Sequence, residues 1–213
     1  MSKTLLDILI EANSVLDLDA SAPTGTEATT RANYANQAVW DASATGQLSE
    51  FKKEYLTTTS TLATIPLPAD FREFQEWPHI QTGTTWQGYE PIEVEDKYTR
   101  SSDYVCYVLG NPAEGYNLIF NNMIAASTLS IIYQRYPSGL LTLTDECELS
   151  DPQYVTRKIE SYVLYSRSDD RFSIAESRAQ QSLSNMMGRE MKGSGGMGKA
   201  TTPVTFKHPL SRG

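Results

Sequence analysis

Residues 193–200, with the sequence GSGGMGKA, come closest to a catalytic motif in residue type and spacing. They contain G-x-x-x-x-G-K, in which glycine amides and a lysine would surround a phosphate group. Such a loop also follows a buried strand, opens a helix and places a serine or threonine after the lysine to bind Mg²⁺. Here a predicted helix precedes the glycines, and Ala200 follows Lys199. A small nucleotide-binding enzyme stays an alternative, but the context predicts a hinge at Gly193, Gly195, Gly196 and Gly198.

The other candidates for chemistry are two histidines and two groups of carboxylates. His79 lies in the predicted loop EWPHIQTG without a nucleophile motif nearby, and His208 lies in the C-terminal segment. One carboxylate group alternates along a predicted strand, which indicates a solvated face: Glu90, Glu93, Glu95 and Asp96. The other lacks calcium-loop spacing and leads into a predicted helix start, where the helix dipole favours acid: Asp145, Glu146, Glu148 and Asp151. We therefore predict no catalytic, cofactor-binding or metal-binding residues and no enzymatic activity.

Charge is distributed unevenly along the 213 residues, which carry a formal net charge of −8. Residues 189–213 contain five basic residues and one acidic residue, a net charge of +4, so the preceding 188 residues carry −12. An acidic body repels phosphate, whereas a basic tail is attracted to an acidic surface or a nucleic acid. Cys106 and Cys147 fit no metal-site spacing and are predicted to be unpaired thiols. No run of 18 apolar residues occurs, so no membrane span is expected.

Helical periodicity appears at both ends of the chain. Apolar residues at spacings of three and four predict two helices within residues 1–49 and two more within residues 150–191. The predicted inner face of the second helix is Ala28, Ala32, Ala35 and Val39, and that of the last helix is Phe172, Ala175, Ala179, Leu183 and Met186. Two of these helices are predicted to begin with a capping box, in which side chains satisfy backbone donors of the first turn. The pairs with this spacing are Thr24 with Glu27, and Ser150 with Gln153.

Between the helices, residues 50–149 have the composition of a β unit. β-branched and aromatic residues concentrate in FKKEYLTTTSTLATIPL, YVCYVL and STLSIIYQRY, whereas LPADFREF predicts a single helical turn. The predicted fold class is therefore α+β. Four helices from residues 1–49 and 150–191 form a core, a mostly antiparallel β unit is inserted between them, and residues 192–213 form an extended C-terminal arm.

In their order along the chain, these features resemble the head-to-tail adaptor proteins of tailed bacteriophages. The family is also called the connector or head-completion proteins and includes the tail tubular protein A type. The paired N-terminal helices are matched by TLLDILIEANSVL and RANYANQAVWDA, and the strand before a Leu-Pro-x-Asp-Phe turn by TIPLPADFREF. A strand with a Tyr-x-x-Tyr-Pro end and an acidic loop is matched by STLSIIYQRYPSGLLTLTDECEL. The C-terminal helix pair is matched by YVTRKIESYVLYSRSDDRFSIAESRAQQSLSNMMGREM.

The resemblance implies a virion structural protein that forms a ring, commonly a dodecamer, under the portal vertex. Such a ring continues the DNA channel, through which DNA passes without specific binding, and provides a platform for the tail. The implied partners are further copies of the chain, the portal protein and the next tail or neck protein, with no membrane. The implied location is the virion neck, after assembly in the host cytoplasm. Another neck or tail-completion protein, such as a stopper or tail terminator, is the alternative.

In such rings a C-terminal arm reaches up to the portal. The arm of this chain combines basic and apolar residues behind its glycines, a composition suited to adding a strand to a partner or placing a side chain in its groove. The arm residues predicted to bind the portal are Lys199, Pro203, Val204, Phe206, Lys207, Leu210 and Arg212.

Overall fold

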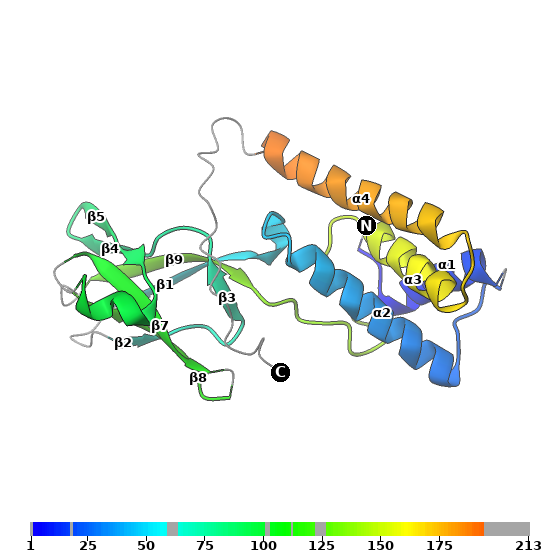
Figure 1. The fold of residues 1–213 in the computed structure, drawn as a ribbon, viewed down its shortest axis with the longest axis horizontal. Helices are drawn as coiled ribbons and strands as arrows, with labels where there is room; N and C mark the ends of the chain where they lie inside the picture. Colours follow the sequence, from blue (N-terminus) through cyan, green and yellow to red (C-terminus); the bar gives the residue numbers. More distant parts are fainter. Residues whose placement is uncertain are drawn as a thin grey trace. The chain divides into compact units, whose positions relative to one another are not determined.

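The computed structural model describes residues 2–17, 19–58, 64–100, 103–111, 113–121 and 127–193. These residues form two compact units (Figure 1). Among the described residues, a helical unit combines the chain up to Phe51 with the chain from Pro137 to the end of the last helix, and a β unit lies within Lys52–Tyr136. The predicted α+β class, with four helices and an inserted, mostly antiparallel β unit, is confirmed.

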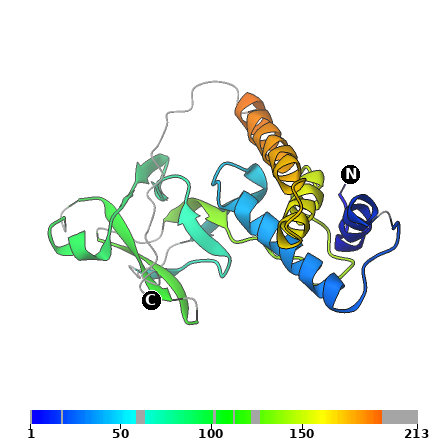
Figure 2. The same ribbon diagram turned by 45° about the vertical axis from the view of Figure 1, so that its right-hand side comes forward.

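The helical unit contains α1 (Leu5–Leu16), α2 (Gly25–Ser43), α3 (Gln153–Ser166) and α4 (Phe172–Gly193). α3 packs against the other three helices, and Figure 2 shows it running among them. Apolar side chains at spacings of three and four meet in one core, in which alanines allow the helix backbones to approach closely. Core residues of the four helices include Leu5, Ile8, Leu9, Ala12, Ala35, Ala38, Val39, Val155, Ile159, Ala179, Leu183 and Met186.

The first two helices begin differently. α1 has a complete capping box, in which the Thr4 amide donates to Asp7 at 3.0 Å and the Asp7 amide donates to Thr4 Oγ1 at 3.2 Å. The box predicted for α2 was wrong, because its N-cap residue Thr24 makes no side-chain cap hydrogen bond. Glu27 pairs instead with Arg31, one turn further along the same helix.

α3 also begins without the predicted capping box of Ser150 and Gln153. Its N-cap residue is Pro152, whose side chain has no hydrogen-bonding group, so the helix begins later than the sequence pattern predicted. Asp151 accepts a hydrogen bond from the backbone N–H of Gln153 at 3.2 Å.

The loop before α3 packs with the helices. Leu140, Cys147 and Leu149 are buried in the helical core, and the Cys147 amide donates to the backbone carbonyl of Lys3 at 2.9 Å. The compact β unit therefore ends at Tyr136, whereas the sequence analysis placed its boundary at residue 149. The difference arises because the apolar side chains of this loop are buried among helices.

The β unit consists of two sheets. The five-stranded sheet contains β1 (Lys52–Thr58), β3 (Phe71–Phe74), β4 (His79–Thr82), β5 (Thr85–Gly88) and β9 (Thr128–Arg135) in the order β1-β9-β4-β5, with β3 also paired to β9. The second sheet contains β2 (Thr64–Pro66), β8 (Gly115–Phe120), β7 (Val105–Asn111) and β6 (Glu90–Pro91), in that order. Residues of both sheets share one core, which includes Ile65, Phe71, Ile80, Tyr89, Cys106, Leu118, Phe120, Leu129, Ile131 and Tyr133.

Three local predictions in the β unit were wrong. The sequence LPADFREF forms a turn followed by β3, because Phe71 is buried and pairs with Arg135 in the sheet. The acidic stretch from Glu90 does not follow one strand, since β6 ends at Pro91 and Val94–Tyr98 forms a 3-10 helix. His79 begins β4, where a loop was predicted.

Candidate functional site

The predicted hinge and arm residues lie almost entirely outside the residues that the structure describes. Gly193 is the last residue of α4, so a helix leads directly into the glycines where a phosphate-binding loop would require a strand. The hinge and portal-binding roles stay predictions. The residues outside the described part are Gly195, Gly196, Gly198, Lys199, Pro203, Val204, Phe206, Lys207, Leu210 and Arg212.

The acidic loop before α3 is held by its own carboxylates. Asp145 accepts hydrogen bonds at 2.7 Å from the backbone amides of Leu141 and Thr142, and at 2.6 Å from the Thr142 hydroxyl. The hydroxyl, followed by the amides, lowers the pKa of the Asp145 carboxyl. No group of three His, Cys, Asp or Glu residues in the described ranges has the geometry of a metal site. The hydrogen bonds of Asp145 therefore stabilise the conformation of the loop.

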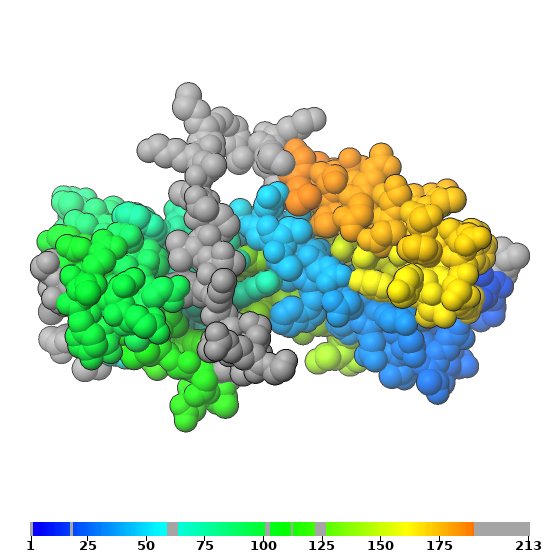
Figure 3. All heavy atoms as spheres, viewed as in Figure 1, coloured from blue at the N-terminus to red at the C-terminus, as the bar shows by residue number. Residues whose placement is uncertain are grey.

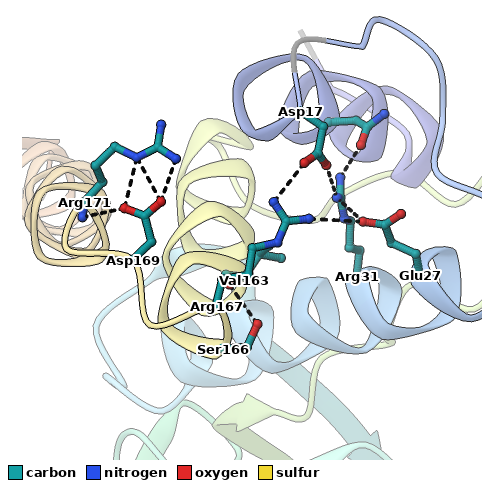
Figure 4. Close-up of polar contacts among 9 residues, drawn as sticks. Asp17, Glu27, Arg31, Val163, Ser166, Arg167, Asp169 and Arg171 are labelled. Carbon is teal, nitrogen blue, oxygen red and sulfur yellow. Dashed lines mark hydrogen bonds and ion pairs between the residues drawn. The ribbon is translucent and has the colours of Figure 1, made fainter.

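A polar cluster around a buried arginine connects three helices (Figure 4). The Arg31 side chain on α2 is 1% exposed, and its Nη1 donates to Asn13 Oδ1 on α1 at 2.5 Å. Its Nη2 donates to Asp17 Oδ2 at 2.5 Å and also to Glu27. Arg167, which caps the end of α3, donates to the second oxygen of Asp17 at 2.8 Å. Asp17 thus bridges two guanidinium groups, and the cluster fixes α1, α2 and α3 relative to one another.

The charges of this cluster compensate one another. Hydrogen bonds from Arg167 and Arg31 lower the pKa of the Asp17 carboxyl, and the same contact raises the pKa of Arg167. The cluster borders an open hollow of about 300 Å³, whose polar lining includes Asp17, Asp19 and Thr24. Since its carboxylates are held by guanidinium groups, the arrangement serves to cross-link helices.

The outward side of α2 has very little charge. Its exposed positions hold hydroxyl and amide side chains together with Trp40, which is 43% exposed. The exception is Glu27, which pairs with Arg31. The outward residues of this α2 face are Thr26, Glu27, Thr29, Thr30, Asn33, Gln37 and Trp40. Because 21% of the chain is charged and solvated helix faces normally carry many charges, such a face is suited to contact with another protein surface.

α4 has a second face of similar composition. In Figure 3, side chains of both α2 (blue) and α4 (orange) lie open at the front. Serine, glutamine and asparagine fill most exposed α4 positions, and the charges present are those of two arginines. The residues of this α4 face are Ser173, Ser177, Arg178, Gln180, Gln181, Ser184, Asn185 and Arg189.

The turn between α3 and α4 exposes apolar side chains. Tyr165 is 70% exposed, and its ring meets that of Phe172 edge-on with 5.5 Å between centroids. Ile174 lies nearby in the sequence and is 54% exposed. Phe172 was predicted on the inner face of the last helix, but it lies before the first buried residue of α4, Ala175, and is 38% exposed.

The sequence analysis missed the Arg31 cluster. It placed the inner face of the second helix along Ala28, Ala32, Ala35 and Val39, whereas the buried positions are Arg31, Ala35, Ala38, Val39, Ala42 and Ser43. The sequence does contain a signal for this cluster: Arg31 lies at helical spacing from alanines, and Glu27 precedes it by four residues. A buried arginine in such a position needs acidic partners.

No protein-family model matches the chain, and no curated protein matches it either. None of the helices in the described ranges combines the length and apolar composition needed to span a bilayer.

Proposed function

We propose that this chain is a non-enzymatic structural subunit of a tailed-phage virion, assembled as a ring at the neck between the portal and the tail. The observation that carries the proposal is the pair of exposed, charge-poor faces on α2 and α4 of the helical unit. The resemblance described above supplies the location. The ring continues the DNA channel and offers its other end to the next tail or neck protein.

The two helix faces suit a contact between unlike surfaces of neighbouring copies. The α4 face carries two arginines, Arg178 and Arg189, whereas the α2 face carries hydroxyl and amide side chains and one acid, Glu27, which is paired with Arg31. Contact of the α2 face of one copy with the α4 face of the next is heterologous, and heterologous contacts generate rings when the rotation closes. Hydroxyl and amide side chains supply the hydrogen bonds of such an interface.

Charge also favours a role around DNA that does not involve binding it. Residues 1–193 carry a formal net charge of −11, and residues 194–213 carry +3. Each phosphate neutralised by lysine or arginine adds affinity, so an acidic wall lets DNA pass without sticking. The basic segment after Gly193 is the part of the chain suited to an acidic surface of the portal.

The ring is tested by the mass of the purified protein in native mass spectrometry and sedimentation over a concentration series. We expect one closed oligomer. The charge-adding pair Ser177→Glu and Gln181→Glu on the α4 face should weaken it at least ~10-fold, because unpaired carboxylates buried in a charge-poor contact cost several kcal/mol. The matched control adds the same charge at exposed positions outside the proposed contacts, Gln47→Glu and Ala113→Glu. A monomer at all concentrations, or equal effects of both pairs, contradicts the proposal.

The arm is tested by capture of the protein on immobilised portal rings. Deletion of residues 194–213 should leave the helical circular dichroism unchanged and abolish capture. Unchanged capture of the truncated protein overturns the arm assignment. If a tail protein captures this chain and the portal does not, the stopper or tail-terminator alternative is favoured. Nucleotide binding that is lost in Lys199→Ala would favour the alternative of a small nucleotide-binding enzyme.

A further inference from the structure

Five strands of the β unit pair with a single neighbour within the described residues, and their outer edges differ in protection against pairing with another chain. β3 carries the charges of Arg72 and Glu73, which discourage pairing. β2 and β6 are short strands that end in Pro66 and Pro91, and proline interrupts pairing at an edge. β1 begins with three exposed charged residues, which also discourage pairing. β5 has the sequence TWQG, and neither it nor the turn before it carries a charge. β5 is therefore the least protected edge.

Within the described residues, β1 and β5 each pair with one strand, so each has an outer edge available for a partner. The uncharged second half of β1, Leu56 to Thr58, lies at one end of the sheet, and β5 lies at the other. Unpaired N–H and C=O groups along such edges form a template for a further strand.

Exposed apolar side chains lie at both edges on the same face of the sheet. Leu56 is opposite Ser130, Ser130 is opposite His79, and His79 is opposite Gly88. Directly opposed residues share a face, and Trp86, two residues before Gly88, shares it too. Leu56 is 58% exposed and Trp86 is 45% exposed.

A second tryptophan extends this apolar face. A Cβ atom added to Gly88 would lie 3.6 Å from Cε3 of Trp77, which places the Trp77 ring over Gly88. Trp77 is 51% exposed. Exposed tryptophans that lie together mark interaction surfaces, where they contribute most of the binding energy.

We propose that β5 of one copy pairs with β1 of the next, so that the five-stranded sheets of neighbouring copies form one continuous sheet around the ring. Each strand along the path β1-β9-β4-β5 is antiparallel to its neighbour, so β1 and β5 run in opposite directions. β5 beside a partner's β1 is therefore antiparallel, like the pairs within the sheet. Trp86 and the partner's exposed Leu56 would then lie on one face as an aromatic–aliphatic cross-strand pair.

The inference rests on the proposed ring and names the β contact within it. Pairing of two β5 edges would be isologous and stop at two copies, whereas pairing of unlike edges propagates and can close. Four strands spaced ~4.8 Å apart span ~19 Å per copy. A ring of ~12 copies would thus have a sheet circumference of ~230 Å and a diameter of ~73 Å.

Disulfide cross-linking tests the pairing in the full chain. Leu56→Cys with Trp86→Cys, and Thr58→Cys with Trp86→Cys, sample two registers that keep the partners on one face. Both native cysteines are buried, so the engineered thiols are the accessible ones. Oxidation of one of these double variants should give a ladder of covalent multimers on a denaturing gel. The single variants, and Leu56→Cys with the exposed Glu114→Cys as control, should give none.

The outcomes separate this inference from the ring itself. A ring by native mass without a ladder in either register overturns the β5–β1 pairing and leaves the proposed function standing. Covalent dimers from the single variant Trp86→Cys indicate a β5–β5 contact and also overturn the β5–β1 pairing. A protein that forms no ring overturns both the proposed function and the β5–β1 pairing. Independently, Trp86→Lys should weaken the ring at least ~10-fold, and Tyr98→Lys, at an exposed aromatic residue outside the proposed contact, should not. Equal ring stability in the two variants contradicts the inference.

Discussion

Replacement of Arg31 by leucine should destabilise the helical unit by about 3 kcal/mol. The change leaves Asn13, which is 5% exposed, with a buried carboxamide oxygen that has lost its donor, at a cost of about 1–3 kcal/mol. Loss of the charge-assisted bonds to Asp17 and Glu27 adds to this cost. Removal of one partner of a fully buried ion pair costs about 3–5 kcal/mol. The lower end applies because the side chains of both carboxylates are at least one-third exposed.

Urea unfolding followed by circular dichroism at 222 nm measures this effect, since all four α-helices of the described residues belong to the helical unit. Arg167→Leu is the matched control, because it removes the other arginine bound to Asp17 from a side chain that is 45% exposed. Exposed ion pairs contribute less than about 1 kcal/mol. A cost below 1 kcal/mol for Arg31→Leu, or equal costs for the two variants, refutes the reasoning.

Three further predictions concern buried groups and one turn. Burial raises the pKa of the Glu160 carboxyl above its unfolded value, so the free energy of unfolding should fall as pH rises from the unfolded through the folded pKa. Glu160→Gln should abolish this decrease and be more stable than the wild type at pH 7, as measured by urea unfolding. An unchanged pH dependence of the free energy of unfolding in the variant contradicts this prediction. Burial also raises the pKa of the Cys106 and Cys147 thiols, so iodoacetamide should label them only after denaturation, and rapid labelling of the native protein would disprove their burial. Gly110→Ala should disrupt the β7–β8 hairpin, because the added Cβ would lie 2.1 Å from the Gly115 carbonyl oxygen and φ is +132°. A melting temperature of Gly110→Ala within a few degrees of that of the wild type would contradict this prediction.

Much of the helical core could be predicted from apolar spacing. Ala175, Ala179, Leu183 and Met186 were predicted as the inner face of the last helix, and all four are buried. The inner face of α2 was predicted only in part: Ala35 and Val39 are buried, but the buried Arg31, Ala38 and Ala42 were missed. Alanines lie on several sides of the helix, so hydrophobicity alone does not distinguish its faces. The choice among its faces is made by tertiary contacts with α1 and α3.

Local motifs predicted less than periodicity did. The spacing of Thr24 and Glu27 fits a capping box, but Arg31 offers Glu27 a charged partner from the same helix. The proposed location at the virion neck depends on the order of elements along the chain. The arm residues proposed to bind the portal lie outside the described residues. The outer edge of β5 is a property of the sheet order, which brings β4 beside β9 from a distant part of the chain. Sequence pattern alone does not specify that order.

The central claim, a ring subunit at the virion neck, is tested most directly by electron cryomicroscopy of purified tailed particles of the phage that encodes this chain. Antibody fragments raised against it should decorate a symmetric collar directly below the portal vertex, with one fragment site per copy around the DNA channel. Decoration of the capsid shell or of the distal tail, or particles that lack the chain altogether, would contradict the account.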